Sequence, residues 1–133
     1  MNVDSLLDMA LTARFHAYAP YSKFKVGCAI LLKNGQFVTG CNIENKSYGL
    51  SICAERNAVF KLISMGYTKN DVEAVCVVGD LKEPIMPCGA CREVLMELLS
   101  PDTKIILSNL ERNYIELNLN DLLPYAFKIN EEL

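Results

Sequence analysis

Cys53-Ala54-Glu55-Arg56 is the stretch around which this sequence of 133 residues is organised, and Pro87-Cys88-Gly89-Ala90-Cys91 is its counterpart further along the chain. Each stretch falls where the pattern predicts the start of a helix, and the partial positive charge at a helix N-terminus favours thiolates. Because catalytic zinc keeps three protein ligands and one open position for water, we expect Cys53, Cys88 and Cys91 to bind one Zn²⁺ ion. The order of ligand, Glu and Pro-Cys-x-x-Cys makes Glu55 the expected proton carrier beside the metal.

The spacing within each stretch determines how these side chains can reach one metal ion. Cys88 and Cys91 are three residues apart and therefore share a helical face. Cys53 and Glu55 are two apart, which deep inside a helix would direct them to different sides, but in the first turn both can approach a metal at the helix end. Three thiolates and one Zn²⁺ ion leave a negative charge, so we expect Arg56 to donate hydrogen bonds to one or more thiolates.

The order of apolar patterns and turn signals predicts a single α/β domain over residues 1–133. A continuous apolar run at Val26–Leu32 predicts a buried strand, and Asn34-Gly35 predicts the hairpin that follows it. Strands alternating with helices indicate a three-layer α/β/α sandwich, and the early hairpin makes the roughly five-stranded sheet mixed. The predicted helices are 4–17 with Asp4 as N-cap, 53–66, 88–100 and 119–125, and the predicted strands are Val26–Leu32, 36–42, 71–79, 104–108 and 114–117.

Composition and charge narrow the class of partner. The net charge is -3 and no Lys/Arg cluster stands out, which disfavours a polynucleotide and favours a small-molecule substrate. Neither a signal peptide nor a membrane-spanning apolar run is visible, so we expect a cytoplasmic protein with reduced thiols. Hydrophobic residues make up 51% of the chain, slightly more than one small domain needs, which is a mild indication of an oligomer.

Five blocks of sequence together resemble the small homotetrameric cytidine deaminases, and the resemblance covers nearly the whole chain. Asn57 stands where that family often has Thr, and Cys28 where it often has Ala, but neither position belongs to the proposed chemistry. The matching blocks are Pro20-Tyr21-Ser22-Lys23-Phe24, Gly40-Cys41-Asn42-Ile43-Glu44-Asn45, Cys53-Ala54-Glu55-Arg56, Pro87-Cys88-Gly89-Ala90-Cys91-Arg92, and Leu122-Leu123-Pro124 followed by Phe127.

The resemblance implies a set of roles for residues in these blocks. It makes Cys53, Cys88 and Cys91 the zinc ligands of each subunit and Glu55 the general acid/base. The remaining implied contacts are with the substrate: Phe24 stacks on the pyrimidine, Asn42 and Glu44 bind the ribose 3′-hydroxyl, the Ala54 backbone binds the base, and Tyr48 and Phe127 come from a neighbouring subunit. Asn42 and Glu44 are also two apart on an extended segment, so both can reach one sugar.

The reaction expected from these residues is hydrolytic deamination of cytidine and 2′-deoxycytidine to uridine and 2′-deoxyuridine, with release of ammonia, in pyrimidine salvage. Nucleotides should be poor substrates, because Glu44 would repel a phosphate. One alternative is a deaminase of the same fold whose substrate is a modified cytosine nucleoside such as blasticidin S. Another is a non-catalytic zinc-binding module, structural or redox-sensing, for which Glu55 would be dispensable.

The same residue types also have simpler interpretations. A lone Cys-x-x-Cys could be structural or redox-active, and the upstream Cys53-Ala54-Glu55 is what favours catalytic zinc here. Cys28, Cys41 and Cys76 fall in predicted strands and are expected to be small core residues. His16, placed in the first predicted helix, is expected at the surface or in packing and not as a ligand.

Overall fold

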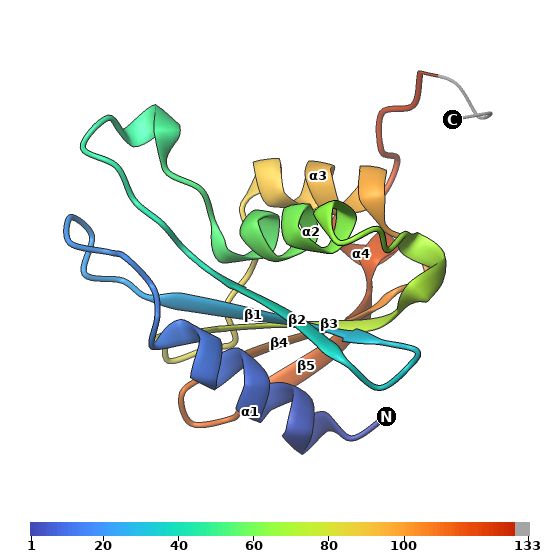
Figure 1. Cartoon of the computed structure of the whole chain (residues 1–133), viewed down its shortest axis with the longest axis horizontal. Coiled ribbons are helices and arrows are strands. Elements are labelled where there is room, and N and C mark those ends of the chain that lie inside the picture. The colour runs from blue at the N-terminus through green and yellow to red at the C-terminus, as the bar shows by residue number, and fades with distance from the viewer. Residues whose placement is uncertain (130–133) are drawn as a thin grey trace.

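A mixed sheet of five strands forms the centre of the computed structural model, which describes residues 1–129 (Figure 1). The strands are β1 (Val26–Leu32), β2 (Phe37–Cys41), β3 (Val72–Gly79), β4 (Lys104–Asn109) and β5 (Tyr114–Asn118). Their order in the sheet is β2-β1-β3-β4-β5. Only β3 and β4 pair in parallel, and the other neighbours are antiparallel, so the predicted mixed sheet is confirmed.

Helices cover both faces of this sheet and give the predicted three-layer α/β/α arrangement. Helix α1 (Val3–Arg14) packs on one face, and α2 (Ala54–Ser64) and α3 (Gly89–Leu98) pack on the other (Figure 1). The short α4 (Leu119–Leu122) buries its leucines in the α2/α3 layer. Two single turns of 3₁₀ helix, η1 (Tyr48–Leu50) and η2 (Lys69–Asp71), interrupt the connections.

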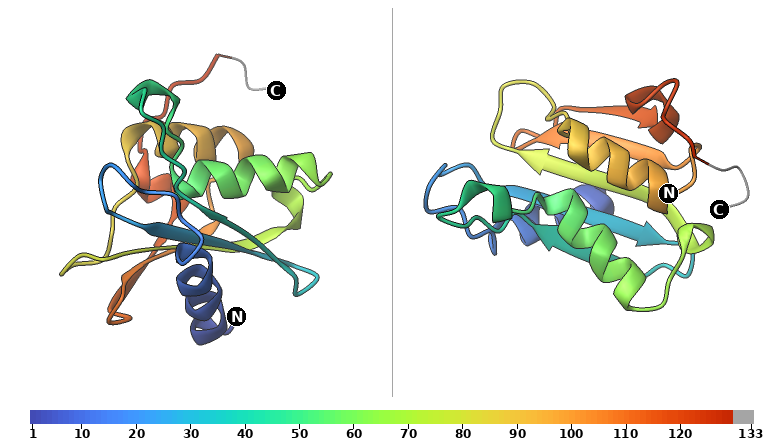
Figure 2. Two further views of the ribbon diagram at one scale, coloured as in Figure 1. Left: turned by 60° about the vertical axis from the view of Figure 1, so that its left-hand side comes forward. Right: turned by 90° about the horizontal axis from the view of Figure 1, so that it is seen from above.

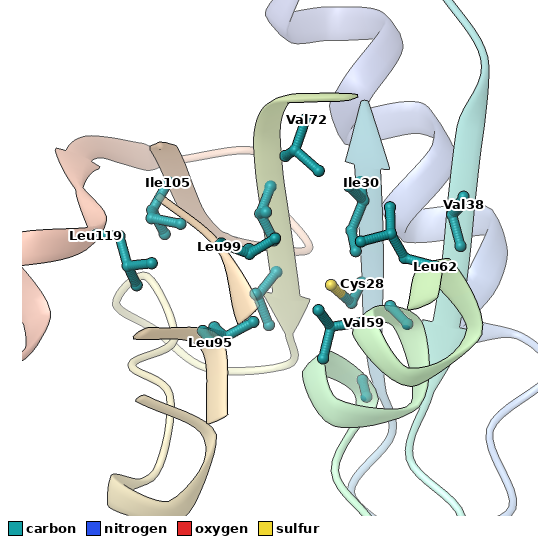
Figure 3. Close-up of a cluster of buried hydrophobic side chains, with 14 of the residues drawn as sticks. Cys28, Ile30, Val38, Val59, Leu62, Val72, Leu95, Leu99, Ile105 and Leu119 are labelled. Carbon is teal, nitrogen blue, oxygen red and sulfur yellow. The ribbon is translucent and has the colours of Figure 1, made fainter. Parts of the chain in front are cut away.

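The hydrophobic core is divided by the sheet into two clusters. The larger cluster lies between the sheet and α2, α3 and α4, with Cys28, Val59, Leu62 and Leu95 among its members (Figure 3). The smaller lies beneath α1 and contains Cys76. All seven residues of β1 are buried, as a strand with helices on both sides requires. Cys28 and Cys76 are therefore core residues as predicted, whereas Cys41 is only half-buried.

Several predicted boundaries are wrong, each for a local reason. The first helix ends at Arg14 and not at Ala17, because the backbone N–H of Tyr18 already donates to Asn42 O at 2.9 Å. Its N-cap is Asn2, which accepts from Ser5 N, and not Asp4. His16 consequently lies in a turn, where it is exposed.

The fourth helix ends at Leu122 instead of 125. Its C-cap, Leu123, leaves the helical region with φ -148° and ψ 65°, as expected for a residue that precedes a proline. In α2, Leu62 is fully buried whereas its neighbour Ile63 is 41% exposed. The predicted domain covers residues 1–133, and its final four residues lie outside the part that the structure describes.

No helix among residues 1–129 is both long and apolar enough to span a membrane.

Candidate zinc centre and active site

Helices α2 and α3 lie side by side over the same face of the sheet, with their N-termini at the same end (Figure 2). Cys53 is the N-cap of α2, and Cys88 is the N-cap of α3. Cys91 lies in the first turn of α3, where its backbone N–H donates to Cys88 Sγ at 3.4 Å. The fold thus gathers all three thiols where two helix N-termini meet, and the partial positive charge of a helix N-terminus favours thiolates. Within the cluster, the hydrogen bond with Cys53 and burial raise the pKa of the Cys91 thiol.

The three thiols form the one group of potential metal ligands found among residues 1–129. Their sulfur atoms all lie within 4.8 Å of one another, with Cys53 and Cys88 3.9 Å apart and Cys88 and Cys91 3.4 Å apart. Tetrahedral zinc at a Zn–S distance of about 2.3 Å places ligand sulfurs about 3.8 Å apart. The cluster therefore fits one Zn²⁺ ion, with three soft ligands and a fourth position open.

Arg56 supplies positive charge to this cluster. Its Nη2 donates to Cys53 Sγ at 3.5 Å, and its Nε is buried without a hydrogen-bond partner. Hydrogen bonds from Cys91 and Arg56 lower the pKa of the Cys53 thiol to about 5. The same interaction with Cys53 raises the pKa of the Arg56 guanidinium. Arg56 therefore stabilises negative charge on sulfur at neutral pH.

Glu55 is the buried carboxyl of the site, with 4% of its surface exposed. Burial raises its pKa, and negative charge at Cys53 adds to the effect. Although Cys53 and Glu55 are only two residues apart, their side chains need not point to different sides of a helix. Cys53 precedes the helix in an extended conformation, with φ -69° and ψ 157°. Because its pKa is raised, the Glu55 carboxyl is suited both to accept a proton and to release it again.

A pocket of about 330 Å³ joins most of the predicted site residues. A further hollow of about 500 Å³ lies along α3 and residues 126–129 and includes Phe127, but its lining contains none of the thiols. The smaller pocket is lined by the predicted site residues Phe24, Asn42, Glu44, Cys53, Ala54, Glu55 and Cys88, and by Ser22, Val26, Ile85 and Met86, for which no role in the site was predicted.

Asn42 and Glu44 line the pocket and also fix the loop that carries Phe24. The Asn42 side chain accepts from Val26 N and donates to Phe24 O, both at 2.8 Å. Glu44 Oε1 accepts from the backbone N–H groups of Tyr21 and Ser22, at 3.0 and 3.1 Å. Hydrogen bonds from Ser22 hold the pKa of the Glu44 carboxyl below its ordinary value. Glu44 is therefore ionised at neutral pH.

Tyr48 and Phe127 are not among the residues that line this pocket in one chain. They are 71% and 74% exposed, respectively. The Tyr48 ring packs edge-on against Tyr21 at a centroid distance of 6.2 Å. Their predicted role in a neighbouring subunit's site remains a prediction.

Two further side chains position the ligand-bearing segments, although the sequence analysis gave them no role. Arg92 joins the start of α3 to α4, donating to Pro87 O at 2.8 Å and Leu122 O at 3.0 Å. Asn57 donates to Cys41 O at 2.8 Å and to Ile52 O at 3.4 Å, and so ties both ends of the loop that precedes Cys53. Each of the two residues directly follows a thiol stretch in the sequence, and this adjacency was the signal from which a positioning role could have been predicted.

The comparisons with known proteins agree with this geometry. The family model described as "Cytidine and deoxycytidylate deaminase zinc-binding region" matches residues 1–107. A cytidine deaminase from Halalkalibacterium halodurans is 50% identical over 127 residues, which cover 96% of this chain and 95% of the relative. One from Mycobacterium tuberculosis is 41% identical over 122 residues, covering 92% of this chain and 86% of the relative.

Solved structures give the same result for the fold. The cytidine deaminase of Burkholderia pseudomallei superposes with a TM-score of 0.93 at 46% sequence identity, covering 96% of this chain and all of that one. The Mycobacterium tuberculosis cytidine deaminase gives a TM-score of 0.81 at 40% identity, covering 97% and 99% of the two chains. Since the family model, the sequence relatives and the fold agree along nearly the whole chain, this protein belongs to the zinc-binding cytidine and deoxycytidylate deaminase family.

Proposed function

We propose that this protein is a zinc-dependent hydrolase that converts cytidine and 2′-deoxycytidine to uridine and 2′-deoxyuridine and releases ammonia. The observation that carries the proposal is a buried carboxyl, Glu55, sharing one pocket with Cys53 and Cys88, two members of a three-thiol cluster of zinc-binding geometry. A closed structural zinc site needs a fourth protein ligand and no such carboxyl. The similarity to proteins named cytidine deaminase supports the choice of substrate.

Cys53, Cys88 and Cys91 would hold the zinc ion, and Arg56 would offset the charge of the thiolates. When bound there, zinc would supply one kind of chemistry: it would lower the pKa of a bound water molecule to about 7. Glu55 takes the proton of the attacking water and passes it to the ring nitrogen beside C4. The water oxygen bonds to C4, and Glu55 then carries the proton of the resulting C4 hydroxyl to the exocyclic amino nitrogen. The bond from C4 to that nitrogen breaks, so that ammonia leaves and a C4 carbonyl remains.

The remaining pocket residues would bind the nucleoside. Phe24 offers a ring face for the pyrimidine, and the Ala54 backbone reaches the base. Asn42 and Glu44 keep hydrogen-bonding capacity for one sugar hydroxyl beside the contacts that they make with the loop. A phosphate on the sugar would meet the ionised Glu44 and be repelled, so that nucleotides are poor substrates.

We further propose that each chain is one domain of a homotetramer whose active sites are shared between subunits. Large apolar side chains are exposed on the same two connecting segments that supply pocket residues, among them Phe15, Tyr48 and Leu50. Burying them against another copy would remove this apolar surface from water. All six cysteines are free, which is typical of a reducing compartment and supports a cytoplasmic role in pyrimidine salvage.

A substrate series tests the proposed function. The zinc-loaded protein is incubated with cytidine, 2′-deoxycytidine, cytidine monophosphate and blasticidin S, and ammonia release is measured for each. We expect comparable turnover of the two nucleosides and little turnover of the nucleotide. Efficient turnover of blasticidin S alone would replace the proposed substrate, and no turnover of any of the four would favour a non-catalytic zinc module.

A further inference from the structure

Ser22 lies between two of the proposed substrate contacts and bonds to both. Its hydroxyl donates to Glu44 Oε2, and the same Oγ accepts from the backbone N–H of Phe24 at 3.0 Å. Ser22 also lines the pocket and is exposed in the single chain. One small hydroxyl thus connects the carboxylate proposed for the sugar with the residue proposed for the base.

This connection leaves Glu44 with little free hydrogen-bonding capacity. A carboxylate offers about four acceptor positions. Tyr21 N and Ser22 N occupy two of them on Oε1, and the Ser22 hydroxyl occupies a third on Oε2. About one acceptor position remains, which suits a single sugar hydroxyl. The Ser22 bond therefore fixes which oxygen of Glu44 is presented to the pocket.

Two side chains hydrogen-bond to the backbone of Phe24, one at its N–H and the other at its carbonyl. Ser22 accepts from its N–H, and Asn42 donates to its carbonyl at 2.8 Å. The tip of the ring packs over Gly79, where an added Cβ would lie 3.1 Å from Phe24 Cζ, and the ring also lines the pocket. The turn that leads into it is tight, with Lys23 at φ 61°. The ring orientation therefore depends on these few polar contacts.

We propose that Ser22 is a positioning residue that couples Glu44 to Phe24, so that the sugar contact and the ring platform are fixed as one unit. This inference rests on the proposed function, because it concerns how the same pocket binds a nucleoside. Ser22 is remote from proton transfer, which belongs to Glu55 and the thiol cluster. Its removal should therefore weaken nucleoside binding more than the chemical step.

The test compares Ser22→Ala with the conservative Ser22→Thr in zinc-loaded protein. We expect Ser22→Ala to raise KM for cytidine roughly tenfold, the value of one charge-assisted hydrogen bond, and to change kcat less than about threefold. Ser22→Thr keeps the hydroxyl at an exposed position and should restore KM to within about threefold of the wild type. An unchanged KM in Ser22→Ala, or an equal loss in both variants, overturns the proposal.

A double-mutant cycle with Glu44→Ala separates coupling from a general loss of order. In the Glu44→Ala background, Ser22→Ala should raise KM by less than about threefold, and a full tenfold increase there overturns the coupling. Hydrogen exchange at the Phe24 amide gives a readout that needs no turnover. It should accelerate about tenfold in Ser22→Ala and not in Ser22→Thr. Lack of cytidine turnover by the wild type contradicts the proposed function, whereas unchanged exchange at Phe24 contradicts the role of Ser22.

Discussion

Glu55 combines burial with a position beside the three thiols, and burial raises the pKa of its carboxyl. Glu55→Gln keeps the shape of this side chain but removes its ability to carry a proton. We expect kcat for cytidine to fall by about two to four orders of magnitude, while the zinc content measured by atomic emission stays unchanged. Glu93→Gln, at an exposed position on α3, is the matched control and should retain full activity. Full turnover by Glu55→Gln would exclude the proposed proton carrier.

Arg56 stabilises the Cys53 thiolate through a hydrogen bond of 3.5 Å. Without this cation, the zinc-bound thiolates lose a charge-assisted partner. We expect Arg56→Gln to weaken zinc affinity roughly tenfold, measured by competition with a chromogenic chelator, and to lower turnover as well. Arg112→Gln removes an equal charge from an exposed pair with Asp8 and should change neither. Equal affinity and turnover in Arg56→Gln and the wild type would contradict this role.

The buried thiol of Cys76 predicts how stability depends on pH. Burial raises its pKa to about 12, whereas an exposed thiol titrates near about 8.5. Between these values the unfolded chain binds fewer protons than the folded one, so stability is lost as pH rises. Urea unfolding from pH 8 to 11 should show the free energy of unfolding falling with pH. The slope should be shallower in Cys76→Ala, by up to about 1.4 kcal/mol per pH unit; parallel slopes would contradict this assignment.

The second helix owes its position to a close approach that a single glycine permits. A Cβ at Gly40 on β2 would lie 2.5 Å from Ala58 N and 2.7 Å from Ala54 O, both backbone atoms of α2. Gly40→Ala should therefore destabilise the fold by about 1–3 kcal/mol in urea. Zinc affinity should also fall, because α2 carries Cys53 at its start. Gly49→Ala, whose added Cβ meets nothing within 4 Å, is the control and should shift stability by less than about 0.5 kcal/mol.

Local sequence patterns predicted which helices and strands are present better than they predicted the residues at which these begin and end. The bounds of β1 were predicted without error, because a continuous apolar run and the Asn34-Gly35 turn define a buried strand locally. The helix ends depend on tertiary contacts that a pattern does not contain, such as the pairing of Tyr18 with Asn42 that ends the first helical segment. In the same way, the two thiol stretches were recognisable because each is local. Ser22, Ile85 and Met86 enter the pocket only after two distant loops meet.

The loops at 15–24 and 43–52 project from one end of the sheet (Figure 1). Both loops supply residues that line the pocket. Aromatic and aliphatic side chains there remain exposed, including Phe15 at 74%. Exposed apolar side chains on loops that also supply the pocket are what a surface covered by another subunit would show. It agrees with the proposal that a single chain holds only part of each active site.

Mixing two inactive variants tests whether sites are shared. Light scattering should first show a mass near four times the 14.8 kDa of one chain. Glu55→Gln and Phe127→Ala should each be inactive alone. If Phe127 serves a neighbouring site, tetramers re-formed from both variants regain activity, because an intact Glu55 then meets an intact Phe127. A monomeric mass, or no recovery in tetramers shown to be mixed, would contradict shared sites.

The most direct test of the whole account measures zinc and turnover together in the wild-type protein. Zinc is removed with a chelator, restored in steps, and ammonia and uridine are measured from cytidine at each step. We predict that activity rises in proportion to bound zinc and saturates at one ion per chain, with one ammonia released for each uridine formed. A protein that binds one zinc per chain through Cys53, Cys88 and Cys91 but leaves cytidine unchanged would contradict the account.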